Sequence, residues 1–330
     1  MKTKIPCFDA HCDTLVYGDR LHQVRLDQER FSARGQLFAV CAEGEMQRDL
    51  TYFTRYARRL TAMPNVVLCR DGDEIGRACR RGQTAAVLSI EGAECVGCEI
   101  GLLRQAHALG ARAVGLTHNR FNGLTGTCAE ETDMGLTERG RAFAEAAVEL
   151  DMILDISHMS DAGAAELFEI GRRRVMASHS NARAVCRHPR NLTDELFLKL
   201  VAARGICGIN LYAPFVHEDG QAAIDDVVRH IEHFAGLDPH AELCLALGCD
   251  FDGCDRLPDG LSSSPELTRL AEALLRYNYP QDMVENIFYY NLYRFCGMRC
   301  KESADRQKKR GIRRAARCGA ESAHSCGTAS

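Results

Sequence analysis

Short apolar segments alternate with longer amphipathic segments along most of the chain, and this alternation predicts the fold. The short segments have the length and composition of buried strands, whereas the longer ones have the apolar period of a helix. Strands that alternate with helices form a parallel sheet through right-handed crossovers. The expected strands are Ile5–His11, Gln36–Ala42, Thr84–Glu91, Ala111–His118, Met152–His158, Val175–Ser180, Gly205–Tyr212 and Cys244–Asp250.

Helices are expected between these strands, and several of their ends are marked. Thr137 and Ser160 stand where N-cap side chains are favoured, and Gly110, Gly171 and Gly205 follow expected helix ends. The expected helices are Met46–Met63, Gly101–Leu109, Thr137–Leu150, Asp161–Arg172, Asp194–Arg204 and Ala222–Ala235, with an extra strand and helix at Val66–Leu68 and Asp73–Arg81 and a closing amphipathic helix at Pro280–Arg294.

Eight strands in about 250 residues match a closed (β/α)₈ barrel of the TIM type better than an open doubly wound sheet. No Gly-x-Gly-x-x-Gly follows the first expected strand, so a dinucleotide-binding fold has no support. The body contains neither a linker nor a repeat. We therefore expect one α/β barrel domain over residues 1–299.

The charge of the chain is unevenly distributed. The formal net charge is −4, but residues 301–330 carry eight Lys/Arg and three Asp/Glu, which is +5 and leaves −9 for the other 300 residues. An acidic body argues against a nucleic-acid surface on the barrel. Residues 300–330 contain few apolar side chains, so we expect a disordered basic tail, with nucleic-acid binding by the tail as the alternative.

Cysteine usage and the N-terminal residues indicate a compartment. The 17 cysteines do not have the spacing of a disulfide framework, which favours reduced thiols. The basic N-terminal residues are not followed by an apolar run, so we expect no signal peptide, and no stretch is long and apolar enough to span a membrane. We therefore expect a cytoplasmic protein without a membrane partner.

Ionisable residues gather at one end of the expected strands. In a (β/α)₈ barrel the carboxyl ends of the strands meet at the face where catalytic residues lie. A single histidine at a strand end is often only a structural residue, but six of the eight expected strands share this feature. The residues concerned are His11 and Asp13, Glu91, His118, His158, His179, and Asp250 with Asp252 beside it.

These residue types suit a centre that holds two divalent metal ions. Histidine and carboxylate ligands favour zinc, and manganese or cobalt are possible substitutes. Two ions need a bridging anion, and no lysine stands at a strand end where it could be carbamylated, so Glu91 is the available bridge. Water between two such ions is acidic enough to supply hydroxide at neutral pH.

Seven motifs resemble those of the renal (membrane) dipeptidase family of zinc peptidases, in the family's order from about Phe8 to Phe295. The resemblance implies a (β/α)₈ barrel with two zinc ions that hydrolyses dipeptides through a metal-bridging hydroxide. The motifs are Asp9-Ala-His-Cys-Asp13, Ser89-Ile-Glu-Gly92, Leu116-Thr-His-Asn119, Leu154-Asp-Ile-Ser-His-Met-Ser160, Ser178-His-Ser-Asn181, Arg190-Asn-Leu192 and Gly248-Cys-Asp-Phe-Asp-Gly253.

The resemblance also implies a role for each matching residue. For the metal ions it implies His11 and Asp13 as ligands of the first zinc, Glu91 as the bridge, and His158 and His179 as ligands of the second zinc.

For the substrate, His118 resembles the histidine that polarises the scissile carbonyl, and Arg190 the arginine that holds the substrate carboxylate. Asp250 resembles the carboxylate that carries a proton to the leaving amine, although Asp252 is an alternative carrier. Tyr212 resembles a pocket-lining tyrosine. Arg190 as a surface ion-pair partner and Tyr212 as ordinary packing stay open.

Three functions are therefore weighed. The first is a dipeptidase, for which the resemblance suggests a homodimer. The second is a related two-metal barrel hydrolase for a lactone, an acylated amino acid or a phosphoester, which would give Arg190 no carboxylate to bind. The third is a metal-binding or nucleic-acid-binding protein without catalysis, which is disfavoured because no ligand or proton carrier is missing. His22, His107, His188, His217, His230, His233, His240 and His324 are expected to be surface or loop histidines.

Overall fold

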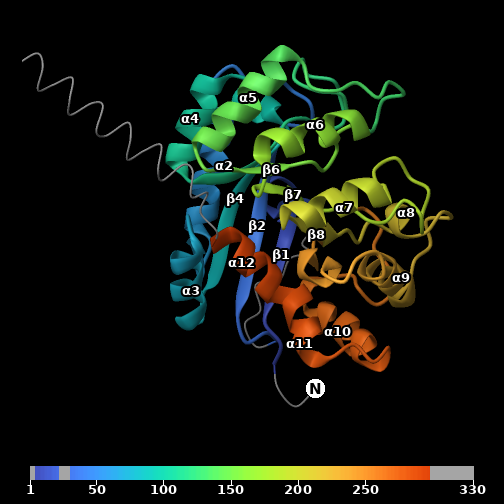
Figure 1. Ribbon diagram of the computed structural model, residues 1–330. Coiled ribbons are helices and arrows are strands. Elements are labelled where there is room, and N and C mark those ends of the chain that lie inside the picture. The colour runs from blue at the N-terminus through green and yellow to red at the C-terminus, as the bar shows by residue number, and fades with distance from the viewer. Residues whose placement is uncertain (1–3, 22–29, 298–330) are drawn as a thin grey trace, which may run out of the picture.

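The computed structural model describes residues 4–21 and 30–297, and the expected basic tail at 300–330 lies outside the described residues. Eight parallel strands form a closed barrel with helices packed around it (Figure 1). The ring closes because β2 pairs with both β1 and β4, and β9 pairs with β1. The strands of the ring are β1 (Cys7–Cys12), β2 (Arg34–Cys41), β4 (Thr84–Glu91), β5 (Ala111–Gly115), β6 (Ile153–Asp155), β7 (Val175–Ala177), β8 (Ile206–Ile209) and β9 (Leu245–Leu247).

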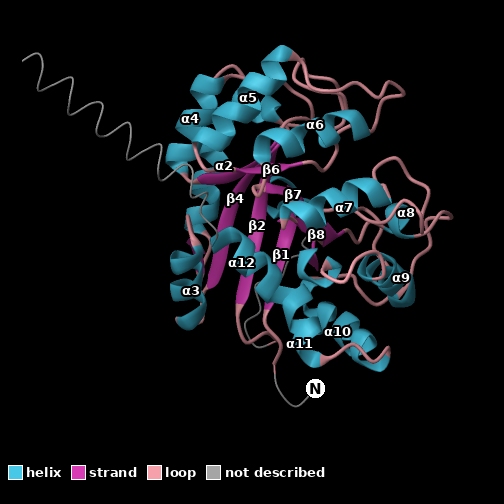
Figure 2. Ribbon diagram, in the orientation of Figure 1, coloured by secondary structure: helices cyan, strands magenta, loops and turns pink. Residues whose placement is uncertain are grey.

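The strands alternate with helices along the chain, as Figure 2 shows, and the predicted (β/α)₈ barrel is confirmed. The N-caps at Thr137 and Ser160 are confirmed, since each side chain accepts a backbone N–H of the following helix. The helices are α1 (Thr14–Leu21), α2 (Thr51–Ala62), α3 (Gly72–Arg80), α4 (Ile100–Leu109), α5 (Glu138–Glu149), α6 (Asp161–Gly171), α7 (Asp194–Ala203), α8 (Ala213–Val216), α9 (Ile224–Ala235), α10 (Leu267–Arg276), α11 (Gln281–Glu285) and α12 (Asn291–Gly297).

Some elements differ from the expectation. The extra strand is confirmed as β3 (Val66–Leu68), which pairs with the first half of β4 and is followed by α3. Helices α1, α8 and α10 were not predicted. The expected closing helix is interrupted, because a π-helical stretch at Asn286–Tyr290 separates α11 from α12. Several expected strands end early; β5, for example, stops at Gly115, so that His118 lies in the loop that follows.

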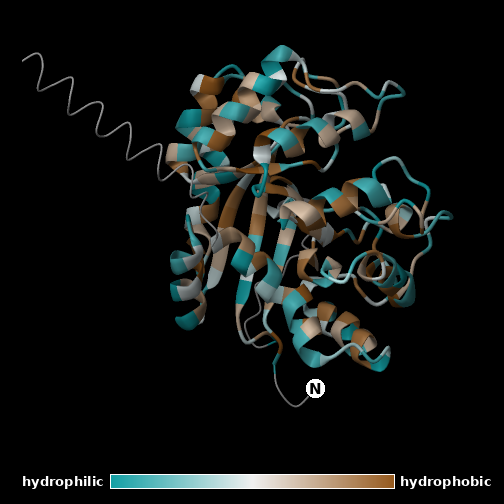
Figure 3. Ribbon diagram, viewed as in Figure 1, coloured by the Kyte–Doolittle hydropathy of each residue, from teal (hydrophilic) through white to brown (hydrophobic). Residues whose placement is uncertain are grey.

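Alternation along β4 shows how the sequence builds the barrel. Ala85 and Val87 belong to the apolar cluster inside the barrel, whereas Ala86 and Leu88 pack in the cluster between barrel and helices. Successive strand residues point to opposite faces, so Glu91 has the inward parity and ends the strand at the mouth. Figure 3 shows the apolar strands at the centre of the molecule and mixed polarity on the surrounding helices.

The structure contradicts the expectation that His230 is a surface or loop histidine. This residue is fully buried in α9, where its Nδ1 accepts the N–H of Ala182 at 3.1 Å and its Nε2–H donates to the carbonyl of Val216 at 2.9 Å. Helical period placed it on the buried face of α9, and the two backbone partners satisfy its ring.

Candidate active site

A pocket of about 900 Å³ opens where the barrel strands end, and the predicted site residues surround it. His11, the one predicted residue that does not line the pocket, is buried directly behind it, with Nε2 3.4 Å from Oε1 of Glu91. The predicted residues that line the pocket are Asp13, Glu91, His118, His158, His179, Arg190, Tyr212 and Asp250.

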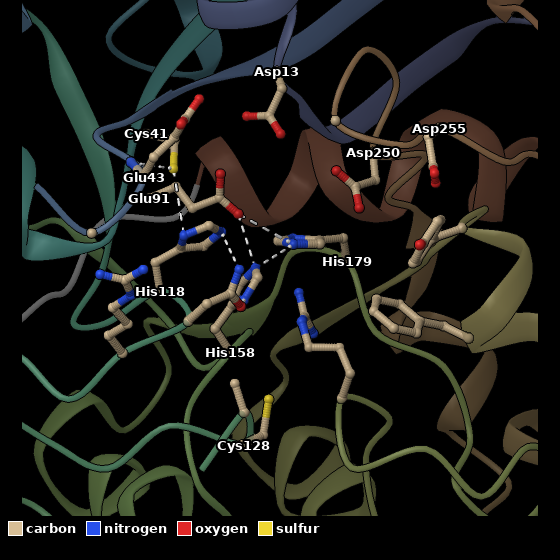
Figure 4. A pocket seen from close by; sticks show the side chains of 18 of the residues that line it. Asp13, Cys41, Glu43, Glu91, His118, Cys128, His158, His179, Asp250 and Asp255 are labelled. Carbon is tan, nitrogen blue, oxygen red and sulfur yellow. Dashed lines mark hydrogen bonds and ion pairs between the residues drawn. The ribbon is translucent and has the colours of Figure 1, made fainter.

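Glu91 lies at the centre of this cluster, as Figure 4 shows. Its Oε1 is 3.0 Å from Nε2 of His158 and 3.4 Å from Nε2 of His179. The two Nε2 atoms are themselves only 3.0 Å apart. Two imidazole lone pairs and a carboxylate oxygen that converge in this way are the donor set of a divalent cation.

A second donor group adjoins the first and shares its central carboxylate. Nε2 of His11 lies 3.8 Å from Oδ1 of Asp13 and 3.9 Å from Oδ1 of Asp250. Among the described residues, Nε2 of His11 and Oδ1 of Asp13 are buried without a hydrogen-bond partner. Leaving such groups unsatisfied costs roughly 1–3 kcal/mol each, and a cation between them would remove that cost.

Burial and crowding perturb the carboxylic acids in opposite directions. Burial and the nearby Glu91 raise the pKa of Asp13 well above its usual range, and burial raises the pKa of Asp250. Burial alone would also raise the pKa of Glu91, but the imidazoles of His11, His158 and His179 outweigh it and hold that pKa well below its usual value. The positive charge nearby thus stabilises the ionised form of Glu91 but does not outweigh the effect of burial at Asp13 and Asp250.

The imidazoles of His158 and His179 are suited to metal binding. Burial lowers the pKa values of His158 and His179 well below the usual value, so that both rings are neutral and offer lone pairs. The residues present therefore fit a divalent metal centre around Glu91. Mixed histidine and carboxylate donors suit a transition metal better than magnesium or calcium, which prefer all-oxygen ligands.

His118 lies beside this centre, in the loop after β5. Its Nδ1 is 3.7 Å from Sγ of Cys41, and its Nε2 is 3.3 Å from Nδ2 of Asn119. Its ring centroid is 4.4 Å from that of His158. Burial lowers the pKa of His118, so that the ring is neutral and has one N–H to donate.

Arg190 is a buried cation in the same pocket. Its Nη1 donates to Oγ of Ser180 at 2.9 Å, and its guanidinium carbon lies 5.8 Å from the centre of the Phe215 ring. Its Nε and Nη2 have no hydrogen-bond partner among the described residues, and the residue is only 5% exposed. It is therefore not a surface ion-pair partner, and it has two free donors for an anion.

The two candidate proton carriers differ in their surroundings. Asp250 approaches the cluster through Oδ1, while its Oδ2 accepts from Nδ2 of Asn210 at 3.1 Å. Asp252 also lines the pocket, but its Oδ2 accepts from the hydroxyl of Thr14 at 2.8 Å. Asp250 thus keeps one carboxylate oxygen within 3.9 Å of Nε2 of His11.

Tyr212 lines the pocket and packs edge-on against Phe215, with ring centroids 4.7 Å apart. Residues to which the sequence gave no role of their own also surround the predicted ones. Asn119, Ser178 and Asn210 each contact a predicted site residue through a polar side-chain atom. The only signal for them was their place beside a histidine or at a strand end.

The comparisons with known proteins agree with this geometry. The model of the membrane dipeptidase family (peptidase family M19) matches residues 1–310. Dipeptidase aclJ of Aspergillus oryzae is 34% identical over 220 residues, which is 66% of this chain and 52% of that protein. An uncharacterized dipeptidase of Schizosaccharomyces pombe is 31% identical over 261 residues, 75% of this chain and 61% of that protein. The chain thus spans about half the length of the curated relatives it matches.

Solved structures show the same fold. A metallopeptidase from Rhodobacter sphaeroides, bound to a phosphinate mimic of the dipeptide L-Ala-D-Ala, has a TM-score of 0.78 at 24% identity over 89% of this chain and 99% of that one. A dipeptidase of family M19 has a TM-score of 0.79 at 24% identity over 90% of this chain and 100% of that one. Within the described part of the chain, every helix is too short or too polar to cross a membrane.

Proposed function

Because this chain belongs to the membrane dipeptidase family, peptidase family M19, we propose that it is a zinc-dependent dipeptidase. The observation that carries the proposal is the cluster around Glu91, where two donor groups meet in one pocket with a buried arginine whose Nε and Nη2 have no hydrogen-bond partner among the described residues. The donor groups supply the means to activate water, and the arginine supplies a site for a substrate carboxylate.

In this proposal His11 and Asp13 would hold one zinc ion, His158 and His179 would hold the other, and Glu91 would be the ligand available to both. When bound, the ions would lower the pKa of water enough to supply hydroxide at neutral pH, and manganese or cobalt also suits these ligands. Asp13 would then be held ionised, because the cations would offset the burial and the charge of Glu91 that raise its pKa.

The other pocket residues act on the substrate. Arg190 binds the substrate carboxylate through Nε and Nη2, the two donors that no described residue uses. His118 donates its N–H to the scissile carbonyl oxygen as negative charge develops there. Tyr212 forms part of the pocket wall beside Phe215.

Peptide cleavage also needs a proton on the leaving nitrogen. Asp250 takes a proton at the cluster and passes it to the amine that leaves, and Asn210 orients its carboxylate through Oδ2. Asp252 keeps its hydrogen bond to Thr14 and takes no part in this transfer.

The experiment measures the turnover of several classes of substrate with and without metal. Dipeptides, an N-acyl amino acid, a lactone and a phosphoester are offered to the zinc-loaded enzyme, to the enzyme after chelation, and to the enzyme with zinc restored. We expect dipeptide hydrolysis that chelation abolishes and zinc restores. Full dipeptide turnover after metal removal would contradict the metal mechanism, and preference for the lactone or phosphoester would favour the alternative barrel hydrolase.

We also propose, from the sequence, one catalytic domain over residues 1–299, a cytoplasmic location and a homodimer. The acidic charge of the body supports a protein that does not bind nucleic acid. Sedimentation of the full chain tests the dimer.

A further inference from the structure

Ser178 lies beneath the pocket, between two of the proposed metal ligands. It follows β7 with the same inward parity as Met176 of the barrel interior, and it is 1% exposed. Its Oγ is 2.7 Å from Nδ1 of His179 and 3.3 Å from Nδ1 of His11. These two rings stack with their centroids 3.7 Å apart and their planes tilted by 30°, so that one hydroxyl contacts a pair of stacked imidazoles.

The backbone holds Ser178 firmly in this place. Its N–H donates to Oδ1 of Asp155 at 3.0 Å, and the same carboxylate oxygen accepts the N–H of Ser157. Its carbonyl oxygen occupies space that a Cβ atom at Gly208 or Gly248 would need. The fold thus fixes the backbone of Ser178 at both its N–H and its carbonyl oxygen, and this limits where its hydroxyl can lie.

The protons of the two histidines show what this hydroxyl does. Nε2 of His11 and Nε2 of His179 both lie 3.4 Å from Oε1 of Glu91. A histidine that binds a cation through Nε2 must carry its proton on Nδ1, and that N–H needs an acceptor. The hydroxyl oxygen of Ser178 has two lone pairs and can accept from both rings, and Oγ of Ser157, 3.4 Å away, is then available to accept its hydrogen.

We propose that Ser178 is a positioning residue shared by the two metal ions, because it fixes the tautomer of one ligand of each. This inference rests on the proposed two-metal function and adds to it a physical link between the ions. His158 is held differently, since its Nδ1 lies 3.0 Å from Oδ1 of Asn119. Asn119 therefore serves only one ion, and Ser178 serves both.

Replacing Ser178 and replacing Asn119 should therefore weaken zinc binding in different ways. Ser178→Ala leaves two buried N–H groups without their acceptor and frees both rings to take the other tautomer. Loss of such an outer partner typically weakens metal binding by about 10–100-fold, so we expect both stepwise zinc constants to weaken by roughly this factor. Asn119→Ala should weaken one constant and leave the other unchanged.

The experiment titrates the metal-free full chain with zinc against a chromophoric chelator and extracts two stepwise dissociation constants. Wild type, Ser178→Ala and Asn119→Ala are compared with Ser89→Ala, a matched control. Like Ser178, Ser89 is a buried serine, but it lies within β4 and its hydroxyl donates to the carbonyl of Phe38 at 3.2 Å. Thermal unfolding of each metal-free protein, followed by circular dichroism, shows whether the variants remain folded.

Two weakened constants in Ser178→Ala, one in Asn119→Ala and none in Ser89→Ala would support the shared role. Unchanged constants in Ser178→Ala, or loss of only one, would overturn it. Wild type that binds fewer than two zinc ions would instead refute the two-metal function, and the shared role with it.

A measurement on the wild type does not depend on whether Ser178→Ala folds. In ¹⁵N-histidine spectra of the zinc-loaded protein, His11 and His179 should both be Nδ1–H tautomers. An Nε2–H tautomer at either ring would overturn the proposal.

Discussion

At the scale of single residues, Arg190 bears most directly on the substrate. It is buried, it stacks near Phe215, and it uses one nitrogen on Ser180 while Nε and Nη2 stay without a partner among the described residues. A buried cation with two parallel free donors is matched by a carboxylate, which accepts both bonds at once.

Arg190→Lys should therefore raise KM for dipeptides more than it lowers kcat. Lysine keeps the charge but cannot form the paired bonds, and a hydrogen bond to a charged group contributes about 1.5–3 kcal/mol, so KM should rise by roughly 10–100-fold. Steady-state kinetics measure the split. The control substrate is a dipeptide amide, which lacks the carboxylate, so its KM should change little. An equal rise in KM for both substrates would show that Arg190 does not bind the substrate carboxylate.

The chemistry-bearing residues could be predicted from the sequence because each follows an apolar run at a strand end. The supporting residues could not. Ser178 and Asn119 act through the nitrogen that each faces, and that depends on how two strand ends and a loop meet in three dimensions. A serine in a sequence carries no sign of which ring it will touch.

At the scale of elements, α9 is tied to the barrel through a neutral histidine. The ring of His230 accepts from Ala182 and donates to Val216, so that it connects α9 to the loop after β7 and to the end of α8. Burial lowers its pKa from 6.5 to about 4. A protonated ring could no longer accept the Ala182 N–H.

Stability should therefore fall as the pH falls from about 6.5 toward 4. In that window the unfolded chain binds a proton at His230 that the native state excludes. The stability advantage of wild type over His230→Gln should shrink across this range by an amount on the order of 2–3 kcal/mol. Urea unfolding at several pH values measures it. An advantage that stays constant down to pH 4 would show that His230 does not titrate in this way.

The prediction of elements succeeded where period and length were clear and failed at their edges. β4 was predicted with its correct bounds, because a long apolar run ends at Glu91. The strand ending at Gly115 was predicted three residues too long, since the residues that approach a site leave the strand pairing. Helix α10 was missed although its buried side chains repeat at helical spacing, at Leu267, Leu270 and Leu274.

At the scale of the whole molecule, the barrel brings together residues that are far apart in the chain. His11 and Asp250 are separated by almost the full length of the barrel sequence, yet they approach within 3.9 Å because β1 pairs with β9. The alternation of strands and helices was sufficient to predict this closure. The positions of the side chains at the mouth required the structure, because they depend on the register between neighbouring strands.

The most direct test of the central claim is an anomalous diffraction map of crystals grown with zinc. The account predicts two strong peaks in the pocket, both at ligand distance from Glu91, one beside His11 and Asp13 and the other beside His158 and His179. A single peak, or peaks that do not touch Glu91, would contradict it.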